Sequence, residues 1–248
     1  MKTVLITGVN KGFGLALTKK FLYEGWRVIG TTRNQNEDLM ELKDYYKEKF
    51  EISFMDLERE ESIRTFIDSI KVDKIDALIN NAATSMGVGP IYDFSSDTSR
   101  IFQINVISYM LLVSLLFRKR FLQKEASIVN VTSNAAFKPL NYLGLYCISK
   151  SAFESYTRSL ALELKEYGIR VNSVGISAQT DLYLEHATQK AELGYTKTID
   201  RIKKGEQLPD PKLCVDATYF LASNSSLHIT GQHIESNSMD IWLWEEKF

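Results

Sequence analysis

Near its amino terminus the chain reads Thr7-Gly8-Val9-Asn10-Lys11-Gly12-Phe13-Gly14, directly after the apolar run Thr3–Thr7 and at the start of a helix-like segment. Glycines at a strand–helix junction permit a tight turn and let the backbone approach a pyrophosphate, which the helix N-terminus attracts. The spacing is Gly-x-x-x-Gly-x-Gly rather than the common Gly-x-Gly-x-x-Gly. An ordinary turn is the alternative interpretation, but a position at the first strand–helix junction favours a dinucleotide site.

The same alternation of apolar runs and helix-like segments continues through the first 175 residues. The expected strands are Thr3–Thr7, Arg27–Thr32, Glu51–Met55, Ala77–Ile79, Ser127–Thr132, Ile169–Val174 and a last one near Gln232–Glu235. The expected helices are Gly12–Glu24, Asn36–Lys47, Arg59–Ile70, Asp97–Gln123, Leu145–Tyr167 and one near Cys214–Ala222. This order predicts an α/β fold: a doubly wound, mostly parallel, seven-stranded sheet with helices on both faces, which is Rossmann-like.

The domain organisation follows from the absence of any linker rich in Pro, Gly or Ser in the 248 residues. We therefore expect a single domain over residues 1–248. The stretch from about 176 to 210 is polar and charged, with weak helical spacing. We interpret it as a mobile flap over the sheet edge, where a substrate would bind.

The composition excludes several classes of protein. With 44% hydrophobic and 25% charged residues, the chain is neither disordered nor a coiled coil. The 30 Lys and Arg balance 31 Asp and Glu, so there is no general charge footprint for nucleic acid or for an anionic membrane. The 2 cysteines are too few for a disulfide framework, and the 3 histidines lack metal-ligand spacing. No signal or membrane-spanning segment is evident, so we expect a soluble cytoplasmic protein without a metal.

The end of the second expected strand bears on the choice of dinucleotide. NAD sites usually place Asp or Glu there, because the carboxylate accepts hydrogen bonds from the ribose 2′-hydroxyl. This chain has Thr32 followed by Arg33, and Lys11 lies in the glycine-rich turn. Two cations without a carboxylate favour a 2′-phosphate and predict NADP(H) as the cofactor. The alternative is that Arg33 and Lys11 are ordinary surface charges.

Candidate chemistry lies at the start of the helix expected over Leu145–Tyr167. Tyr146 and Lys150 are four residues apart and share one helix face. An ammonium group one turn away favours a phenolate and would lower the pKa of the tyrosine, which suits proton exchange with an alcohol or a carbonyl. Ser133 follows an expected strand at the carboxyl edge of the sheet, where it can hydrogen-bond a substrate oxygen. Asn105 lies in the long helix before it, where a buried amide can organise water.

The chain resembles the short-chain dehydrogenase/reductase family, in its branch of single-domain enzymes of about 250 residues, from Thr3 to about Met239. Separately the matching motifs are weak, but their order and spacing are specific. The matches are Thr7-Gly8-x-x-x-Gly12-x-Gly14, Asp56-Leu57, Asn80-Asn81-Ala82-Ala83, the tetrad Asn105, Ser133, Tyr146 and Lys150, Arg170-Val171-Asn172, and Ile229-Thr230-Gly231-Gln232.

The resemblance implies a role for each matching residue. Tyr146 would be the general acid in reduction and the general base in oxidation, and Ser133 would polarise the substrate oxygen. Lys150 would bind the nicotinamide ribose and lower the pKa of Tyr146, and Asn105 would support a water in the proton relay. The cofactor-binding residues would be Gly8, Asn10, Lys11, Gly12, Phe13, Gly14, Arg33, Asp56, Leu57, Asn81, Ala82, Tyr146, Lys150, Ile176 and Thr180.

Three departures from the family pattern stand out. Ala83 replaces the last glycine of the Asn-Asn-Ala-Gly motif, and Ile176-Ser177 replaces a Pro-Gly pair beside the nicotinamide. The second departure bears on the loop conformation and on the contacts expected of Thr180. Ser236-Asn237-Ser238-Met239 replaces the usual Val-Asp-Gly-Gly.

Three functions remain open from the sequence. The first is an NADP(H)-dependent carbonyl reductase or alcohol dehydrogenase. The second is an NAD(H)-dependent dehydrogenase in sugar or secondary-metabolite synthesis, and the third is a cofactor-binding regulatory protein that no longer catalyses. The substrate, the direction of reaction and the choice between homodimer and homotetramer stay undetermined. The aromatic tail Ile241–Phe248 is expected to pack at a subunit interface, or else to reach a substrate pocket.

Overall fold

The computed structural model describes residues 1–93, 97–206 and 208–236 of the chain. The aromatic tail Ile241–Phe248 lies outside these residues, as does most of the segment that replaces Val-Asp-Gly-Gly.

Within the described residues, seven strands form one sheet in the order β3-β2-β1-β4-β5-β6-β7, and every neighbouring pair is parallel. This confirms the predicted α/β sheet. The reversal of strand order between β1 and β4 creates the switch point where ligands of open α/β sheets bind. The strands are β1 Thr3–Thr7, β2 Arg27–Thr32, β3 Phe50–Phe54, β4 Ile75–Asn80, β5 Leu122–Thr132, β6 Arg170–Ile176 and β7 His233–Ser236.

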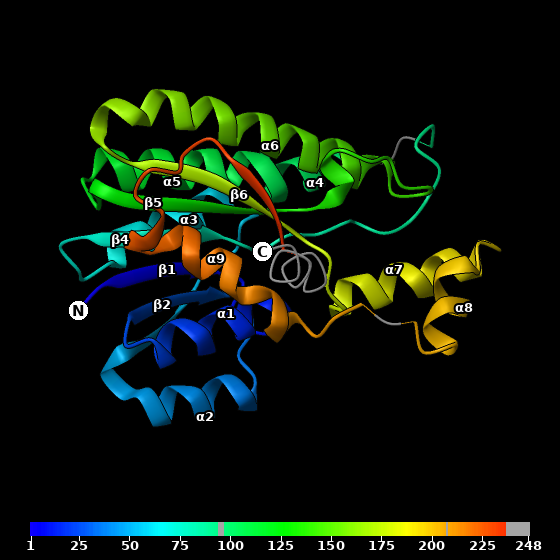
Figure 1. The fold of residues 1–248 in the computed structure, drawn as a ribbon, viewed down its shortest axis with the longest axis horizontal. Coiled ribbons are helices and arrows are strands. Elements are labelled where there is room, and N and C mark those ends of the chain that lie inside the picture. The colour runs from blue at the N-terminus through cyan, green and yellow to red at the C-terminus, as the bar shows by residue number, and fades with distance from the viewer. Residues whose placement is uncertain (94–96, 207, 237–248) are drawn as a thin grey trace, which may run out of the picture.

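Helices cover both faces of the sheet (Figure 1). Alternate residues of β1 enter different cores: Leu5 packs with α3, α5 and α6, whereas Val4 and Ile6 pack with α1, α2 and α9. All three side chains are fully buried, which explains why the strand is apolar throughout. The helices are α1 Gly12–Tyr23, α2 Glu37–Tyr46, α3 Glu60–Ser69, α4 Asp97–Phe102, α5 Ser108–Arg118, α6 Gly144–Leu164, α7 Asp181–Glu192, α8 Lys197–Lys203 and α9 Val215–Ala222.

The long helix expected over Asp97–Gln123 differs from the prediction in two ways. A π-turn, Gln103–Ile107, separates α4 from α5, and the helix ends at Arg118 because β5 begins at Leu122. The first part of β5 is exposed and polar at residues 123–125, so periodicity could not identify it as a strand. The helical stretch Thr98–Arg118 is apolar and long enough to cross a membrane, but its side chains Tyr109, Leu112 and Leu116 are buried in the core.

The segment predicted as a flap contains two helices, α7 and α8, which lie beyond the carboxyl ends of the strands (Figure 1). The Thr180 side chain caps α7 by accepting a hydrogen bond from the Tyr183 backbone N–H, 3.2 Å away. Only Ala187 and Lys190 of α7 are buried, which accounts for its weak helical pattern in the sequence. Several residues of this segment line the cleft described below, and the role of the segment as a mobile flap over a substrate stays a prediction.

Candidate active site

A cleft of about 940 Å³ opens at the carboxyl edge of the sheet and gathers loops that are far apart in the sequence. It brings together nearly all of the residues that the sequence singled out. Those that line it are Gly8, Asn10, Lys11, Gly12, Phe13, Gly14, Arg33, Asp56, Leu57, Asn81, Ala82, Ser133, Tyr146, Lys150, Ile176 and Thr180. Asn105 is fully buried and does not line the cleft.

The glycine-rich turn has the geometry that a dinucleotide pyrophosphate requires. A Cβ added at Gly14 would lie 2.0 Å from the Gly8 carbonyl oxygen, so only glycine fits there. Gly12 has φ +56° and nothing within 4 Å of an added Cβ, which leaves its backbone open to a ligand. The N-cap residue Lys11 makes no side-chain cap, and the first turn of α1 holds no acidic residue. The uncompensated N–H groups at this helix end therefore suit an anion.

Asn81 supports this turn from the neighbouring strand. Its Nδ2 donates to the carbonyl oxygens of Thr7 at 2.8 Å and Gly8 at 3.2 Å. The Thr7 hydroxyl in turn accepts hydrogen bonds from the backbone N–H groups of Asn81 and Ala82. The amide of Asn81 thus holds the turn in place, although the resemblance assigned this residue to the cofactor ribose.

The far end of the cleft carries the charges that bear on the adenosine ribose. Arg33 lines the cleft just after β2, where Thr32 stands in place of a carboxylate. Arg100 of α4 also lines it and donates to both carboxylate oxygens of Glu58, at 2.7 and 3.0 Å. Hydrogen bonds from Arg100 hold the pKa of Glu58 below its usual range. Sequence reasoning missed Arg100 and Glu58, because nothing in the sequence indicates that α4 reaches this loop.

Lys11 differs from its expected role at the 2′-phosphate. Its ammonium group lies 3.2 Å from a carboxylate oxygen of Asp181 and 3.9 Å from one of Glu185. Both acids belong to α7, so Lys11 joins the glycine-rich turn to the helix that covers the cleft. The case for a 2′-phosphate then depends on Arg33.

The catalytic candidates Ser133, Tyr146 and Lys150 meet at the near end of the cleft. Tyr146 and Lys150 are 9% and 2% exposed on one face of α6. The Lys150 ammonium donates to the Val131 carbonyl oxygen at 3.0 Å and lies 5.8 Å from the centre of the Tyr146 ring. Ser133 hydrogen-bonds Tyr146, and its Oγ also accepts from the Ala135 N–H at 3.1 Å. This places two hydroxyl groups and one cation together at the end of β5.

The pKa values of this pair differ from the expectation for the tyrosine. Burial raises the pKa of Tyr146 to about 12, and the hydrogen bond with Ser133 lowers it only in part. Burial also lowers the pKa of Lys150 to about 8. The expected low pKa of Tyr146 is thus not found in this structure, because desolvation of the buried phenolate is the largest cause of the shift. A lowering contribution from Lys150 stays a prediction. Near pH 7 the phenol keeps its proton, as a general acid must.

Asn105 occupies the π-turn and uses its side chain internally. Its Oδ1 accepts from the Thr84 backbone N–H at 2.9 Å, and its Nδ2 donates to the Thr84 carbonyl at 2.7 Å and to the Ser149 hydroxyl at 3.0 Å. The amide thus connects the loop after β4 to α6. Any part that Asn105 plays in a water relay would fall to its backbone, and π-turns of this kind are frequent at functional sites.

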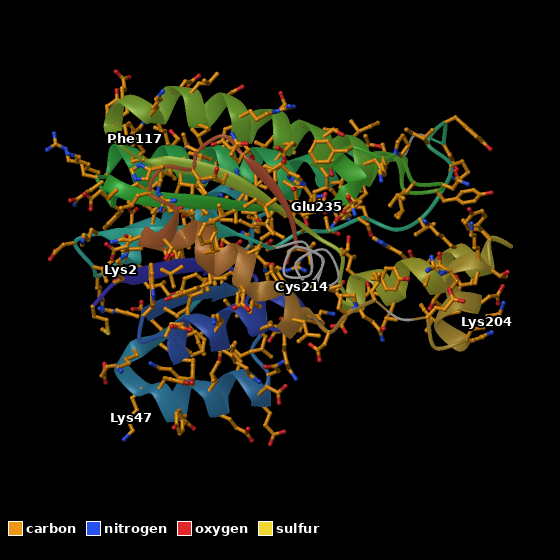
Figure 2. All side chains as sticks on the ribbon, in the orientation of Figure 1. Lys2, Lys47, Phe117, Lys204, Cys214 and Glu235 are labelled. Carbon is orange, nitrogen blue, oxygen red and sulfur yellow. The ribbon has the colours of Figure 1, made fainter. Side chains whose placement is uncertain are left out.

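A partly buried polar network behind Ser133 was missed in the sequence. The Asn134 amide lies 3.0 Å from the Ser177 hydroxyl and, with the amide oriented to donate, 2.7 Å from Glu235. Figure 2 labels Glu235 on β7. Its carboxylate lies 2.8 Å from His233 Nε2, and His233 Nδ1 lies 3.3 Å from Glu154 of α6. The network joins the loop after β5 to Ser177, which replaces the glycine of the family's Pro-Gly pair. The sequence did contain one sign of this network: the short strand β7 carries two ionisable residues, His233 and Glu235.

His233 makes a testable contribution to stability. Burial by itself would lower the pKa of His233, but hydrogen bonds to Glu154 and Glu235 together outweigh burial and raise the pKa to about 9. Because the unfolded value is about 6.5, the stabilisation is complete below pH 6.5 and is lost as the pH rises through about 9. Lys150 acts in the opposite direction, since the cost of burying its charge is relieved as the pH rises above about 8, the lowered pKa of this group. Both the wild type and a His233→Gln variant contain Lys150, so its contribution cancels when their free energies of unfolding are subtracted.

We expect this difference in the free energy of unfolding to shrink by about 2 kcal/mol between pH 6.5 and pH 9.5. Urea unfolding of both proteins at each pH measures it. His228 is exposed, so a His228→Gln variant serves as the control and should differ from the wild type equally at both pH values. A His233→Gln difference that stays constant would contradict the charged network.

Comparison with known proteins places these features in a family. The family model described as short chain dehydrogenase matches residues 2–187. An L-xylulose reductase of Caenorhabditis elegans is 32% identical over 239 residues, covering 93% of this chain and 92% of that protein. The 3-oxoacyl-(acyl-carrier-protein) reductase FabG of Buchnera aphidicola is 28% identical over 238 residues, covering 95% and 96%.

A solved structure agrees with these sequence matches. A short chain dehydrogenase family protein from Francisella tularensis is similar with a TM-score of 0.82 and 27% identity, covering 95% of this chain and 96% of that one. The matched residues include the glycine-rich turn and the Tyr146–Lys150 pair. The chain belongs to the short-chain dehydrogenase/reductase family of oxidoreductases, which use nicotinamide cofactors.

Proposed function

We propose that this protein is an NADP(H)-dependent reductase of ketones, which it converts to secondary alcohols. The observation that carries the proposal is the meeting of Ser133, Tyr146 and Lys150 in the cleft that also holds the glycine-rich turn. The L-xylulose and 3-oxoacyl reductases among its relatives support a carbonyl substrate. The raised pKa of Tyr146 supports the reductive direction, because the phenol is the protonated acid near pH 7.

In this proposal Ser133 and Tyr146 bind the oxygen of the substrate carbonyl. Their hydroxyl groups are adjacent, because they are hydrogen-bonded to each other; a carbonyl oxygen that replaces this hydrogen bond receives two O–H donors. Tyr146 then transfers its proton to that oxygen as negative charge develops on it. The nicotinamide cofactor supplies the hydride when it is bound. The nearby Lys150 ammonium stabilises the phenolate that remains on Tyr146.

The Lys150 side chain is held in position by a hydrogen bond to strand β5. One of its N–H groups donates to the Val131 carbonyl, so two remain for a ribose hydroxyl or a water. The side chain is 2% exposed, and its charge therefore acts in a medium of low polarity, where it is stronger than in water. The glycine-rich turn would hold the pyrophosphate, and Arg33 would hold a 2′-phosphate.

The choice of NADP(H) depends on Arg33, and it predicts a selective effect. Arg33→Ala should raise the Kd for NADPH by roughly 10- to 100-fold, because a charge-assisted contact to a phosphate is lost. The Kd for NADH should change by no more than about 3-fold. Titration of each cofactor by fluorescence measures both values. Arg118 is exposed and outside the cleft, so Arg118→Ala is the matched control and should leave both unchanged.

Equal weakening of NADPH and NADH would contradict the NADP(H) assignment and favour the NAD(H)-dependent alternative. The enzyme assignment is tested separately by following cofactor oxidation with a panel of ketones, aldehydes, acyl thioesters and keto sugars. Turnover of a panel member with NADPH supports the proposal. Tight NADPH binding without any turnover would favour the non-catalytic alternative.

A further inference from the structure

A histidine of α7 lies at the reacting end of the cleft, beside Tyr146. The ring of His186 packs edge-on against the Tyr146 ring, with centroids 5.7 Å apart and planes at 65°. Both side chains line the same cleft. The helix that covers the cleft therefore brings an imidazole group next to the proposed general acid.

Neither nitrogen of this imidazole has a hydrogen-bond partner among the described residues. Nε2 is buried, and no hydrogen bond is formed by Nδ1 either. A polar ring that lines a cleft and lacks a partner is available to a polar group of a ligand. Burial, with the positive charge of Lys190 one turn along α7, lowers the pKa of His186 to about 4. The ring is thus neutral near pH 7 and has one N–H donor and one acceptor nitrogen.

The rest of the cleft lining supplies apolar surface and polar groups that already have partners. Ser133 and Tyr146 are the groups that the proposed function assigns to the carbonyl oxygen, and Asn134 and Ser177 hydrogen-bond each other, which leaves His186 for a second polar atom of the substrate. Five aliphatic or aromatic side chains from three segments also line the cleft. These are Leu140, Leu143, Leu182, Tyr183 and Leu208.

We propose that the His186 imidazole hydrogen-bonds a hydroxyl group on the carbon next to the reacting carbonyl, so that the substrates are α-hydroxy ketones with an apolar remainder. The inference rests on the proposed function, whose substrate class it names. A hydroxyl both donates and accepts, so it pairs with the donor or with the acceptor nitrogen of the neutral ring. Because the two rings are in contact, a substrate whose carbonyl oxygen meets Tyr146 extends past His186, and the hydroxyl on the neighbouring carbon is the group nearest to the imidazole.

A pocket of this kind discriminates strongly against a substrate that lacks the hydroxyl. A methyl group in its place would leave the His186 imidazole unpaired in the complex, and such sites reject the deficient analogue. The matched pair for the test is 1-hydroxy-2-hexanone and 3-heptanone, which differ by a hydroxyl in place of a methyl group next to the carbonyl. The ratio of their kcat/KM values with NADPH is the quantity to measure.

The wild-type ratio should fall by roughly 10- to 100-fold in a His186→Leu variant, which keeps the packing against Tyr146 but removes the polar nitrogen. The fall should come from the hydroxy ketone, with kcat/KM for 3-heptanone unchanged or higher. Comparing wild type and variant cancels the intrinsic difference in reactivity between the two ketones. A His186→Gln variant, which restores a polar group, should recover part of the ratio.

The controls separate the possible failures. His228 is exposed and outside the cleft, so His228→Leu should keep the wild-type ratio. If the wild type reduces both ketones and the ratio is the same in His186→Leu, the assignment of His186 is overturned and the reductase function stands. If the wild type reduces neither ketone but turns over another carbonyl compound of the panel, the inference about His186 is overturned and the reductase function stands. If it turns over none of them, the proposed function and the inference built on it fail together.

Discussion

Replacing Tyr146 by Phe is expected to lower the kcat for ketone reduction by roughly 10²–10⁴-fold, the usual contribution of a general acid. The substitution removes only the hydroxyl, so the ring still packs against His186. Because the pKa of Tyr146 is raised to about 12, the wild-type phenol carries the proton throughout the neutral range. Without it, the developing alkoxide must take a proton from water. The Kd for NADPH should stay within about 3-fold of the wild-type value.

Tyr156 supplies the matched control for this substitution. It lies on the same helix, α6, and packs against Phe153 rather than lining the cleft. Tyr156→Phe deletes the same atom from the same helix and should keep nearly full activity. Single-turnover measurements separate loss of chemistry from slow product release. A Tyr146→Phe enzyme that reduced its substrate as fast as the wild type would contradict the assignment of Tyr146 as the general acid.

Replacing Gly14 by Ala is expected to weaken NADPH binding by about 100-fold or more. The added Cβ would lie 2.0 Å from the Gly8 carbonyl oxygen and 2.6 Å from Asn81 Nδ2. The first of these atoms is backbone, so no side-chain rotation relieves the overlap and the turn itself must move. The turn presents the N-terminus of α1, and its displacement removes N–H groups that the pyrophosphate requires. Titration of NADPH and thermal unfolding of the free protein measure the two consequences.

Gly89→Ala is the control for the cost of adding a methyl group to a glycine. Nothing lies within 4 Å of an added Cβ at Gly89, and its backbone does not require a positive φ. This variant should bind NADPH like the wild type and unfold at a similar temperature. Wild-type affinity in the Gly14→Ala protein would mean that the turn does not hold the pyrophosphate.

The strands and the cleft could be predicted from the sequence because their signals are local. Two strands, Thr3–Thr7 and Arg27–Thr32, agree with the prediction residue for residue, since burial on both faces restricts them almost entirely to apolar, glycine and β-branched residues, with Arg27 at the only partly buried position. The site residues could be predicted from residue type and position. The glycine-rich turn and Ser133 lie at strand ends, and Tyr146 and Lys150 lie on one helix face. Parallel topology then carries all of these strand ends to one edge.

The remaining features depend on contacts between distant segments, which spacing does not encode. Lys11 turned towards α7 because two acids of that helix face it, and Glu58 is held by Arg100 from a helix 42 residues further along. The pKa of Tyr146 is raised mainly by burial, which depends on the whole fold, and the hydrogen bond with Ser133 lowers it only in part. His186 stood out only when the structure placed its ring against Tyr146.

The most direct test of the account follows the hydride itself. The protein is incubated with NADPH that carries deuterium at the transferable position and with the ketone from the panel that gives the fastest turnover, and the product is analysed by mass spectrometry. The account predicts an alcohol with deuterium on the former carbonyl carbon, formed by the wild type and lost in Tyr146→Phe. An alcohol without deuterium, or bound NADPH that reduces no carbonyl compound in the panel, would contradict it.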